Sequence, residues 1–297
     1  MKIDLQMHTN YSDGMNSPAE IASLAKKGGL NVISVTDHDR IDSIGKVVDA
    51  CKPFGIDVIP GVEISTTFEG KPLHVLGYSI DASDAAFISF LRKINDFRRD
   101  NFIERMPVVN ENLKRAGLKE ADADKYKGRD PKYYSHPGLS LFLAEEGVIS
   151  NPSEGFQYLK GVKGTTSPFG PKDAFDAIHK AGGIAVMSHP FAPKIAIRVL
   201  RPDRAGQEEV VALFKKQGLD GLECYQTGHG ASDVEFCLEM AAKYKLIITA
   251  GSDWHGHRGP EDTGIREYLP YYIDELGDLA VPEEKVAEIL KGLGWKQ

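Results

Sequence analysis

Short apolar runs alternate with amphipathic stretches through the first sixty residues of the chain. Apolar, largely β-branched runs at residues 3–7, 31–36 and 56–59 predict three strands. Between the first two, apolar positions at helical spacing predict a helix that starts after Ser17 and ends at Gly28. A second helix is expected near residues 42–54. Strands that alternate with helices in this order indicate a parallel sheet.

Beyond residue 60 this pattern changes and later returns. Residues 64–68 and 73–78 predict two short strands around a turn. Apolar positions in residues 83–165 follow helical spacing, and Pro107 is expected to kink or restart the first of these helices. Alternation then resumes, with strands expected at 184–188, 219–224 and 246–250, helices at 170–181, 207–217 and 231–244, and a closing helix at 282–290. About seven strands result, and a single (β/α) barrel with an insertion fits the length as well as two domains do.

Composition narrows the class of protein without naming a function. The chain has 297 residues, 41% hydrophobic and 27% charged, as in an ordinary globular protein. A formal charge of −7 argues against a broad basic surface for duplex DNA, although bound cations can reverse the field locally for a small anionic substrate. With no apolar leader, no membrane-spanning run and three cysteines outside any CxxC spacing, we expect a cytoplasmic protein with reduced thiols. The oligomeric state is open.

Metal-ligand residue types recur where the predicted strands end. Histidines follow or lie in five of these strands, and aspartates and a glutamate accompany them. Because the carboxyl ends of parallel strands meet on one face, these side chains are expected to converge. Histidine together with carboxylate selects zinc, manganese or iron rather than calcium. The predicted site therefore holds two or three divalent cations, and no single metal is specified.

The ordered set of these residues resembles the motifs of the PHP family, named after polymerase and histidinol phosphatase. In that family an HxH motif, an aspartate before a glycine, TDH, GxE, a later histidine, SHP and SDxH build a trinuclear metal site. The matching positions are Gln6, His8, Asp13, His38, Glu63, His74, His189, Asp253 and His255. The resemblance covers nearly the whole chain. It implies an α/β fold, a distorted seven-stranded (β/α) barrel made of residues 1–82 and 166–297, with 83–165 as a helical insertion capping the mouth of the site.

The resemblance also implies a role for each ligand. Glu63 would bridge two metals, the first completed by His8 and Asp253 together with position 6, and the second by His74 and His189. Asp13, His38 and His255 would hold the third. Gln6 departs from the family, which usually has histidine there, and an amide oxygen is a poorer ligand than imidazole. The first metal could bind more weakly, shift toward manganese or magnesium, or be absent; we favour a retained but weakened site.

Within the family, the chain resembles the branch that removes the 3′-phosphate of nucleoside 3′,5′-bisphosphates and trims short RNA from the 5′ end. The likeness includes an arginine-rich helix at Arg98-Arg99, a helix led by His136, and Glu223 with His229. Tyrosines at 133–134 stand where relatives often carry arginine, which puts the exact substrate in doubt. Residues proposed to bind substrate are Arg99, His136, Arg198, Arg201 and His229, although for the arginines ordinary surface charge is an equal alternative.

The expected activity is metal-dependent hydrolysis of a phosphate ester, in which metal-activated hydroxide attacks phosphorus. A nucleotide or short oligonucleotide is the expected substrate, with no duplex DNA and no membrane as partner. One alternative is a phosphatase for histidinol phosphate or a sugar phosphate. Another is a non-catalytic metal-binding module, toward which only Gln6 leans.

Overall fold

The computed structural model describes residues 1–162, 167–192, 196–256 and 275–296. Within these ranges eight strands form two sheets. The first sheet is parallel, in the order β1-β2-β3, and comprises β1 (Ile3–Asp4), β2 (Val32–Ile33) and β3 (Asp57–Val58). The second, in the order β4-β5-β6-β7-β8, comprises β4 (Gly61–Phe68), β5 (Lys71–Tyr78), β6 (Ile184–Met187), β7 (Gly221–Gln226) and β8 (Ile247–Gly251). Strand β5 is antiparallel to both of its neighbours, and β6, β7 and β8 are parallel.

Individual hydrogen bonds connect the two sheets where the ladders stop. The amide of Leu5, just after β1, donates to the carbonyl of Ala250 in β8 at 3.0 Å. On the other side the amide of Asp39, beyond β2, donates to the carbonyl of Glu63 in β4 at 2.9 Å. The α/β class is thus confirmed, but the described residues form no closed seven-stranded barrel. The strands of the first sheet are only two residues long, so the connections around them are single bonds instead of ladders.

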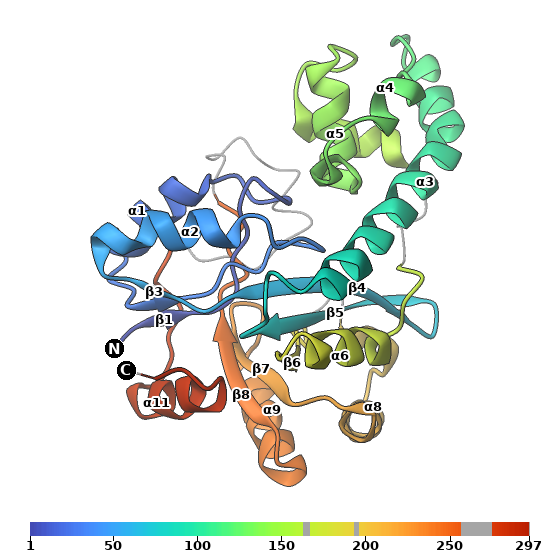
Figure 1. Ribbon diagram of the computed structural model, residues 1–297. Coiled ribbons are helices and arrows are strands. Elements are labelled where there is room, and N and C mark those ends of the chain that lie inside the picture. The colour runs from blue at the N-terminus through green and yellow to red at the C-terminus, as the bar shows by residue number, and fades with distance from the viewer. Residues whose placement is uncertain (163–166, 193–195, 257–274, 297) are drawn as a thin grey trace.

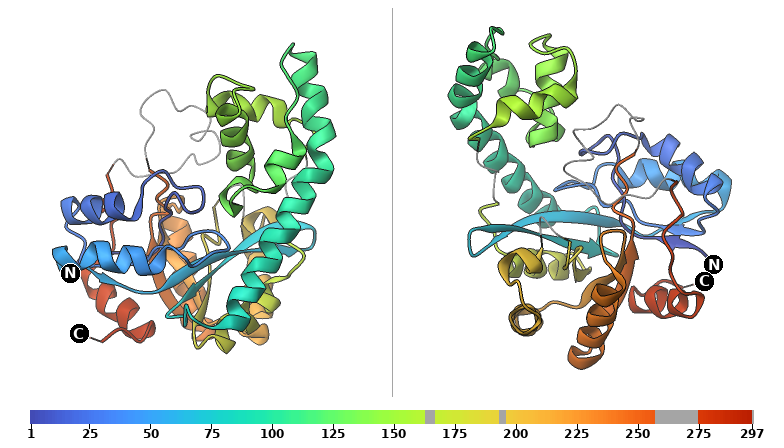
Figure 2. Two further views of the ribbon diagram at one scale, coloured as in Figure 1. Left: turned by 45° about the horizontal axis from the view of Figure 1, so that its top comes forward. Right: turned by 180° about the vertical axis from the view of Figure 1, so that it is seen from behind.

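Helices cover the outer faces of the strands, as Figures 1 and 2 show. Helices α1 (Pro18–Lys27) and α2 (Ile44–Cys51) pack on each other beside the first sheet, and the 3-10 turn η1 (Lys52–Phe54) follows. Against the second sheet pack α6 (Pro171–Lys180), α9 (Ala231–Tyr244) and α11 (Glu283–Gly292), with α7 (Ile197–Leu200) and α8 (Arg204–Gln217) outside them. Helix α1 has the predicted capping box, in which Ser17 and Glu20 satisfy each other's backbone amides.

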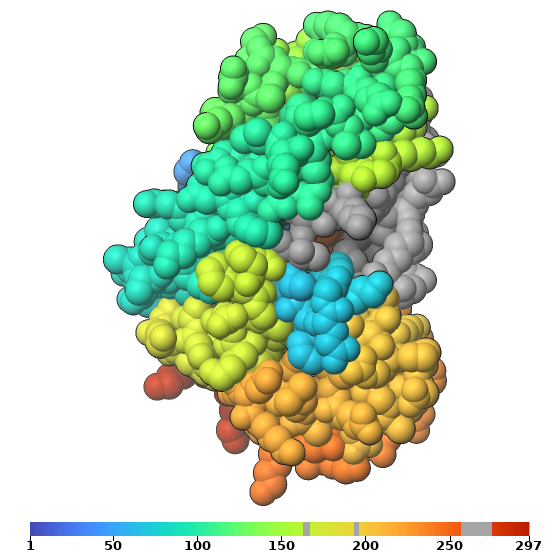
Figure 3. All heavy atoms as spheres, turned by 90° about the vertical axis from the view of Figure 1, so that its right-hand side faces the viewer, coloured from blue at the N-terminus to red at the C-terminus, as the bar shows by residue number. Residues whose placement is uncertain are grey.

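The segment between β5 and α6 is a helical lobe with its own hydrophobic core. Its elements are α3 (Ala85–Arg115), α4 (Ala123–Lys127), η2 (Pro131–Tyr133), α5 (His136–Glu145) and η3 (Pro152–Leu159). Figure 3 shows α3 running from the strand-bearing part of the molecule up into this lobe. Its buried cluster includes Phe102, Tyr126 and Phe142, and it is separate from the main core. We call residues 85–162 the insertion.

Of the two expectations for Pro107, a kink or a restart, the restart is wrong, because Pro107 lies inside the single 31-residue helix α3. Proline removes a backbone donor and normally breaks a helix interior. Here Met106 and Val109, on either side of it, are buried in the core of the insertion. Packing on both sides therefore keeps the two halves in one helix. Among the described residues, no helix is both long enough and apolar enough to span a bilayer.

Candidate metal centre

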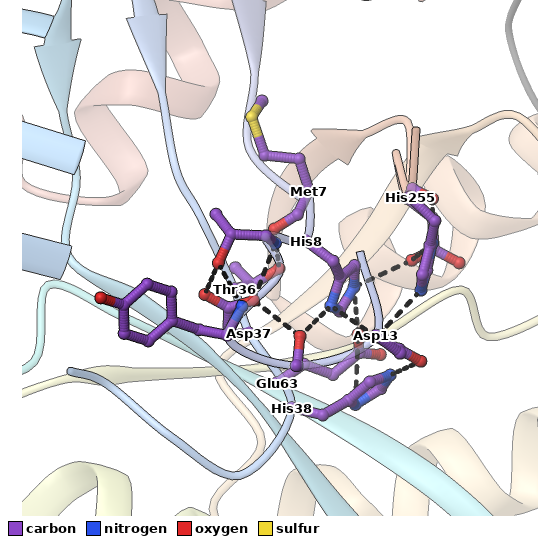
Figure 4. A network of polar contacts seen from close by, with 12 residues as sticks. Met7, His8, Asp13, Thr36, Asp37, His38, Glu63 and His255 are labelled. Atoms are coloured by element: carbon purple, nitrogen blue, oxygen red, sulfur yellow. Dashed lines mark hydrogen bonds and ion pairs between the residues drawn. The ribbon is translucent and has the colours of Figure 1, made fainter. Parts of the chain in front are cut away.

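The side chains of the candidate centre project from the ends of strands that the two sheets bring together. His8 follows β1 and His38 follows β2, while Glu63 lies in β4. Isolated bridges join Met7 to Trp254 and His38 to Glu63, so segments from opposite ends of the chain lie side by side here. Figure 4 shows the resulting group, in which His8, Asp13, His38, Glu63 and His255 point toward one another.

The carboxylate of Glu63 lies at the middle of this group and is fully buried. Its Oε2 is 3.1 Å from His8 Nε2. Its Oε1 is 3.1 Å from both His74 Nδ1 and His189 Nε2. One carboxylate thus has imidazoles on both of its oxygens, which is the arrangement that a ligand shared by two cations requires.

Asp13 and Asp253 supply the remaining carboxylates. The Asp13 oxygens lie 3.6 Å from His8 Nδ1, 3.8 Å from His38 Nε2 and 3.4 Å from His255 Nε2. Asp253 Oδ1 lies 3.2 Å from His8 Nε2. The structure contains three sets of residues in which all the ligand atoms of a set lie within 4.8 Å of one another. The sets are His8, Asp13, His38 and His255; His38, Glu63 and His74; and His8, Glu63 and Asp253.

The close packing of imidazoles and carboxylates shifts the pKa values of several residues in the cluster. Burial by itself would raise the pKa of Glu63, but the charges of His38 and His74 outweigh it and hold that pKa well below its ordinary value. Burial would lower the pKa of His8, yet hydrogen bonds to Asp253 and Glu63 raise it well above the usual value. Burial lowers the pKa of His38 to about 4, against the pull of Asp13 and Glu63. Protons therefore supply part of the positive charge that these buried carboxylates need.

The donor set fits divalent cations. Asp13 Oδ1 and His38 Nδ1 are buried and have no hydrogen-bond partner among the described residues, although both face the cluster. A buried polar atom without a partner costs free energy that a bound cation would recover. Cations also replace the protons on imidazole, because metal ligands bind deprotonated. Imidazole and carboxylate donors in three adjacent sets thus support divalent-metal binding here.

Gln6 lies within the cluster as a hydrogen-bond donor. Its Nε2 donates to Glu63 Oε2 at 3.1 Å and to Ser188 Oγ at 3.0 Å, and Ser188 Oγ donates to Glu63 Oε1 at 2.7 Å. Both atoms that Nε2 faces are acceptors, so the reversed amide would set its oxygen against a carboxylate. The amide oxygen, Oε1, has no hydrogen-bond partner among the described residues.

A second layer of carboxylates orders the loops that carry the ligands. Asp37 accepts hydrogen bonds from the backbone and hydroxyl of Thr9 and from the hydroxyl of Ser12. Figure 4 shows Asp37 beside His8 and Thr36. Asp39 accepts from the backbone and hydroxyl of Ser65, at 2.7 Å each. These bonds fix the segments on either side of His38.

A pocket opens where Asp13 and His38, from the first of these ligand sets, meet the insertion. Ser12, Asp13 and His38 line one side, and the lining is completed by Arg40, Arg98, Pro131, Lys132 and Ser135. Arg98, from α3, donates to Asp39 Oδ2 at 2.5 Å, and Arg40 donates to Asp130 Oδ1 of the insertion at 2.5 Å. Both ion pairs join the insertion to the strand-end loops. Arg40, Arg98 and Lys132 form the cationic wall of this pocket, in which both arginines are paired with carboxylates.

All nine predicted metal-ligand residues lie in this cluster, whereas the described contacts of the five proposed substrate-binding residues lead elsewhere. The arginines pair with carboxylates: Arg99 with Asp96 and Asp100, Arg198 with Asp233, and Arg201 with Glu69. A substrate role for these arginines requires exchange of these partners and stays a prediction.

The two histidines proposed to bind substrate are engaged with the fold. His136 Nε2 is 3.4 Å from the carbonyl oxygen of Val162, and its ring packs against Phe102 with centroids 5.4 Å apart. His229 Nδ1 is 3.1 Å from the carbonyl oxygen of Cys224, and its Nε2 faces the amide of Phe191. Substrate contact by either residue is also untested.

Sequence reasoning missed several functional residues around the cluster. Arg40, Lys132 and Ser12 line the pocket, and Asp37 and Asp39 brace the loop of His38. One signal was present: the aspartates directly flank His38 in the sequence Thr-Asp-His-Asp. For Lys132 no local pattern distinguishes it from an ordinary surface lysine.

Known proteins share both the sequence pattern and the fold. The profile of the PHP domain matches residues 4–146. A 5′-3′ exoribonuclease of Haemophilus influenzae is 30% identical over 260 residues, which cover 86% of this chain and 90% of that protein. A 3′,5′-nucleoside bisphosphate phosphatase of Chromobacterium violaceum is 27% identical over 274 residues, covering 90% of this chain and 92% of the relative. A solved structure from Bifidobacterium adolescentis, described as a metal-dependent phosphoesterase, has the same fold, with a TM-score of 0.70, 24% identity and coverage of 98% and 96% of the two chains.

Proposed function

Because this chain belongs to the PHP-domain family and is a phosphoric ester hydrolase, we propose that it hydrolyses a phosphate monoester of a nucleotide or trims short oligonucleotides. One observation carries this proposal: imidazoles and carboxylates from widely separated strand ends form three adjacent sets of ligand atoms beside a pocket with a cationic wall. Relatives named for a nucleoside bisphosphate and for RNA support the nucleotide class.

In the proposed mechanism, two or three manganese, zinc or iron ions would supply the Lewis acidity that activates water and neutralises phosphoryl oxygens. Glu63 would be shared between two ions, with His8 and Asp253 on one side and His74 and His189 on the other. Asp13, His38 and His255 would hold the third position. His8, Glu63, His189 and His255 are buried and the other four ligands are half-buried, which limits the access of bulk water and strengthens the electrostatic interactions between them.

The pocket wall would position the substrate. Arg40 and Arg98 are fixed by carboxylates, whereas the Lys132 ammonium lies 5.0 Å from the ring centroid of Tyr133. These cations offset the negative charge of a phosphorylated substrate, and Ser12 and Ser135 offer hydroxyls. Arg99, His136, Arg198, Arg201 and His229 remain candidates for contacts to the rest of the substrate.

Gln6 makes the cation position beside His8 and Asp253 a weak one in this proposal. An amide nitrogen donates hydrogen bonds and offers no lone pair to a cation. Three protein ligands are left at that position, from His8, Glu63 and Asp253. The position is retained, but it fills at higher metal concentration than the others.

The test is a substrate panel on protein reconstituted separately with manganese, zinc and iron. The panel holds a nucleoside 3′,5′-bisphosphate, a 5′-phosphorylated RNA trimer, histidinol phosphate, a sugar phosphate and an aryl phosphate. We expect fastest turnover of the nucleotide or RNA substrate, abolished by chelator and by His38→Ala. Preference for histidinol phosphate or the sugar phosphate would contradict the nucleotide assignment. Less than about one equivalent of bound metal, without activity, would indicate a non-catalytic module instead.

A further inference from the structure

The turn that carries His189 has a backbone conformation that needs support. His189 follows β6 and has φ of 28°, in the left-handed region that residues other than glycine rarely adopt. Its Nε2 nevertheless lies 3.1 Å from Glu63 Oε1 and 3.3 Å from His74 Nδ1. Such a conformation is unfavourable for a residue with a side chain and persists only when the surroundings hold it.

Two side chains from β7 and the loop after it hold the backbone of this turn. Glu223 Oε2 accepts the amide of His189 at 2.8 Å. Two residues further along, the amide of Phe191 donates to His229 Nε2 at 3.3 Å. His229 Nδ1 donates to the carbonyl of Cys224 at 3.1 Å, which assigns the proton to Nδ1 and leaves Nε2 as an acceptor. Burial lowers the pKa of His229 to about 4, so Nε2 keeps its lone pair at neutral pH.

Glu223 makes few other contacts that would account for its position. It is fully buried, and its Oε1 has no hydrogen-bond partner among the described residues. A Cβ on Gly251 would come within 2.6 Å of that oxygen, so the carboxyl group is packed closely against the strand backbone. Burying a carboxyl group that makes so few hydrogen bonds costs free energy. The bond to His189 is therefore the feature that explains it.

We propose that Glu223 and His229 are positioning residues that hold the turn of residues 189–191, so that the imidazole of His189 faces Glu63. They act through the backbone of this turn, by accepting the amides of His189 and Phe191. This inference rests on the proposed function, because the conformation of the turn matters for activity only if His189 is a metal ligand.

The test compares Glu223→Leu with Glu223→Gln. Leucine removes the acceptor for the His189 amide, whereas glutamine keeps an oxygen at the same place. Zinc affinity is measured by competition with a chromophoric chelator, alongside thermal unfolding of the metal-free protein. We expect zinc binding at one position to weaken about 10- to 100-fold in E223L and to stay within about threefold of wild type in E223Q. Rescue by glutamine would not follow from a loss of core packing alone.

A matched control lies in the insertion. Asn110 exchanges two hydrogen bonds with the backbone of Ala121, far from the turn. Asn110→Leu should lower the melting temperature and leave zinc affinity unchanged. If E223L does not fold, His229→Leu replaces it. This residue is partly exposed, and its loss removes the acceptor for the Phe191 amide together with the donor to the Cys224 carbonyl. It should weaken zinc binding several-fold.

The outcomes separate the two proposals. If wild-type protein binds zinc and E223L or H229L binds it equally tightly, the positioning role is wrong and the proposed function stands. If E223Q binds zinc as weakly as E223L, the acceptor is not what matters, and the positioning role is likewise wrong. If wild-type protein binds less than about one equivalent of zinc, manganese or iron, the proposed function itself fails, and the positioning role fails with it.

Discussion

The metal centre and the insertion are stabilised in opposite ways. In the centre, buried imidazoles and carboxylates come from distant parts of the chain; His8 and Asp253, 3.2 Å apart, are 245 residues apart in sequence. In the insertion, apolar side chains between residues 102 and 162 pack on one another, and the charged groups lie outside. The centre therefore needs the whole fold and a counter-charge, whereas the insertion depends mainly on local burial. A substitution that disrupts one of these regions should therefore leave the other intact.

The largest effect should come from Glu63→Gln, which keeps the size of the central side chain and removes its charge. We expect hydrolysis to fall at least about 1000-fold, because in the proposed function this carboxylate would hold cations on both of its oxygens. Bound metal should fall as well. Hydrogen exchange of the amides around Phe102 should not change, because the insertion has its own core. Activity within about tenfold of wild type would remove Glu63 from the centre.

The reciprocal change is Phe102→Ala in the insertion. Phe102 is fully buried and packs edge-on against Tyr126, with ring centroids 6.3 Å apart. Its loss should destabilise the protein by about 3–5 kcal/mol, as measured by denaturant unfolding, with zinc affinity within about threefold of wild type. Val108→Ala, at a side chain 40% exposed on the same helix, is the control and should cost under about 0.5 kcal/mol. A parallel loss of zinc binding in F102A would show that the two regions are coupled.

A smaller effect is expected from Gln6→His. The imidazole would replace a hydrogen-bond donor with a ligand nitrogen beside His8 and Asp253. Zinc should bind about tenfold more tightly at one position, which is about 1.4 kcal/mol. Gln6→Leu supplies no ligand and should show no such gain. A weaker zinc affinity in Q6H would mean that the hydrogen bond from the Gln6 amide to Glu63 contributes more to zinc binding than a fourth ligand does.

The smallest effect concerns pH and the insertion. Burial lowers the pKa of His136, which the Val162 carbonyl opposes only in part. Below about pH 6.5 His136 is protonated in the unfolded chain but stays neutral in the folded protein. The free energy of unfolding therefore decreases as the pH falls through that value. The melting temperature should drop less between about pH 7.5 and about pH 5.5 in His136→Gln than in wild type. Equal drops would show that His136 titrates normally in the folded protein.

The sequence predicted the centre more fully than the framework that holds it. The candidate ligands are recognisable because eight of them are histidine, aspartate or glutamate near the end of an apolar run. Their side chains lie together in the structure, and metal binding by them stays a prediction. The strands of the first sheet proved two residues long because hydrogen bonding between segments such as Leu5 and Ala250 decides where a ladder ends. Local hydrophobicity does not determine such pairing.

The partners of charged side chains were also beyond prediction. The sequence placed Arg98 only in an arginine-rich helix, yet its guanidinium is hydrogen-bonded to Asp39, which is fully buried. Arg201 looked like a free cation for substrate and pairs with Glu69, 132 residues away in sequence. Long side chains reach several elements, and only the tertiary fold decides which one they meet.

The bond between Leu5 and Ala250 has a consequence for biosynthesis. The segment at the start of the chain stays unpaired on this side until β8 has been made, and the residues that complete the cluster, Asp253 and His255, come later still. The insertion can collapse once residue 162 has left the ribosome tunnel, because its contacts are local. A nascent chain arrested before residue 253 would thus carry a folded lobe beside an incomplete cluster of candidate ligands, which is completed only after His255 has been made.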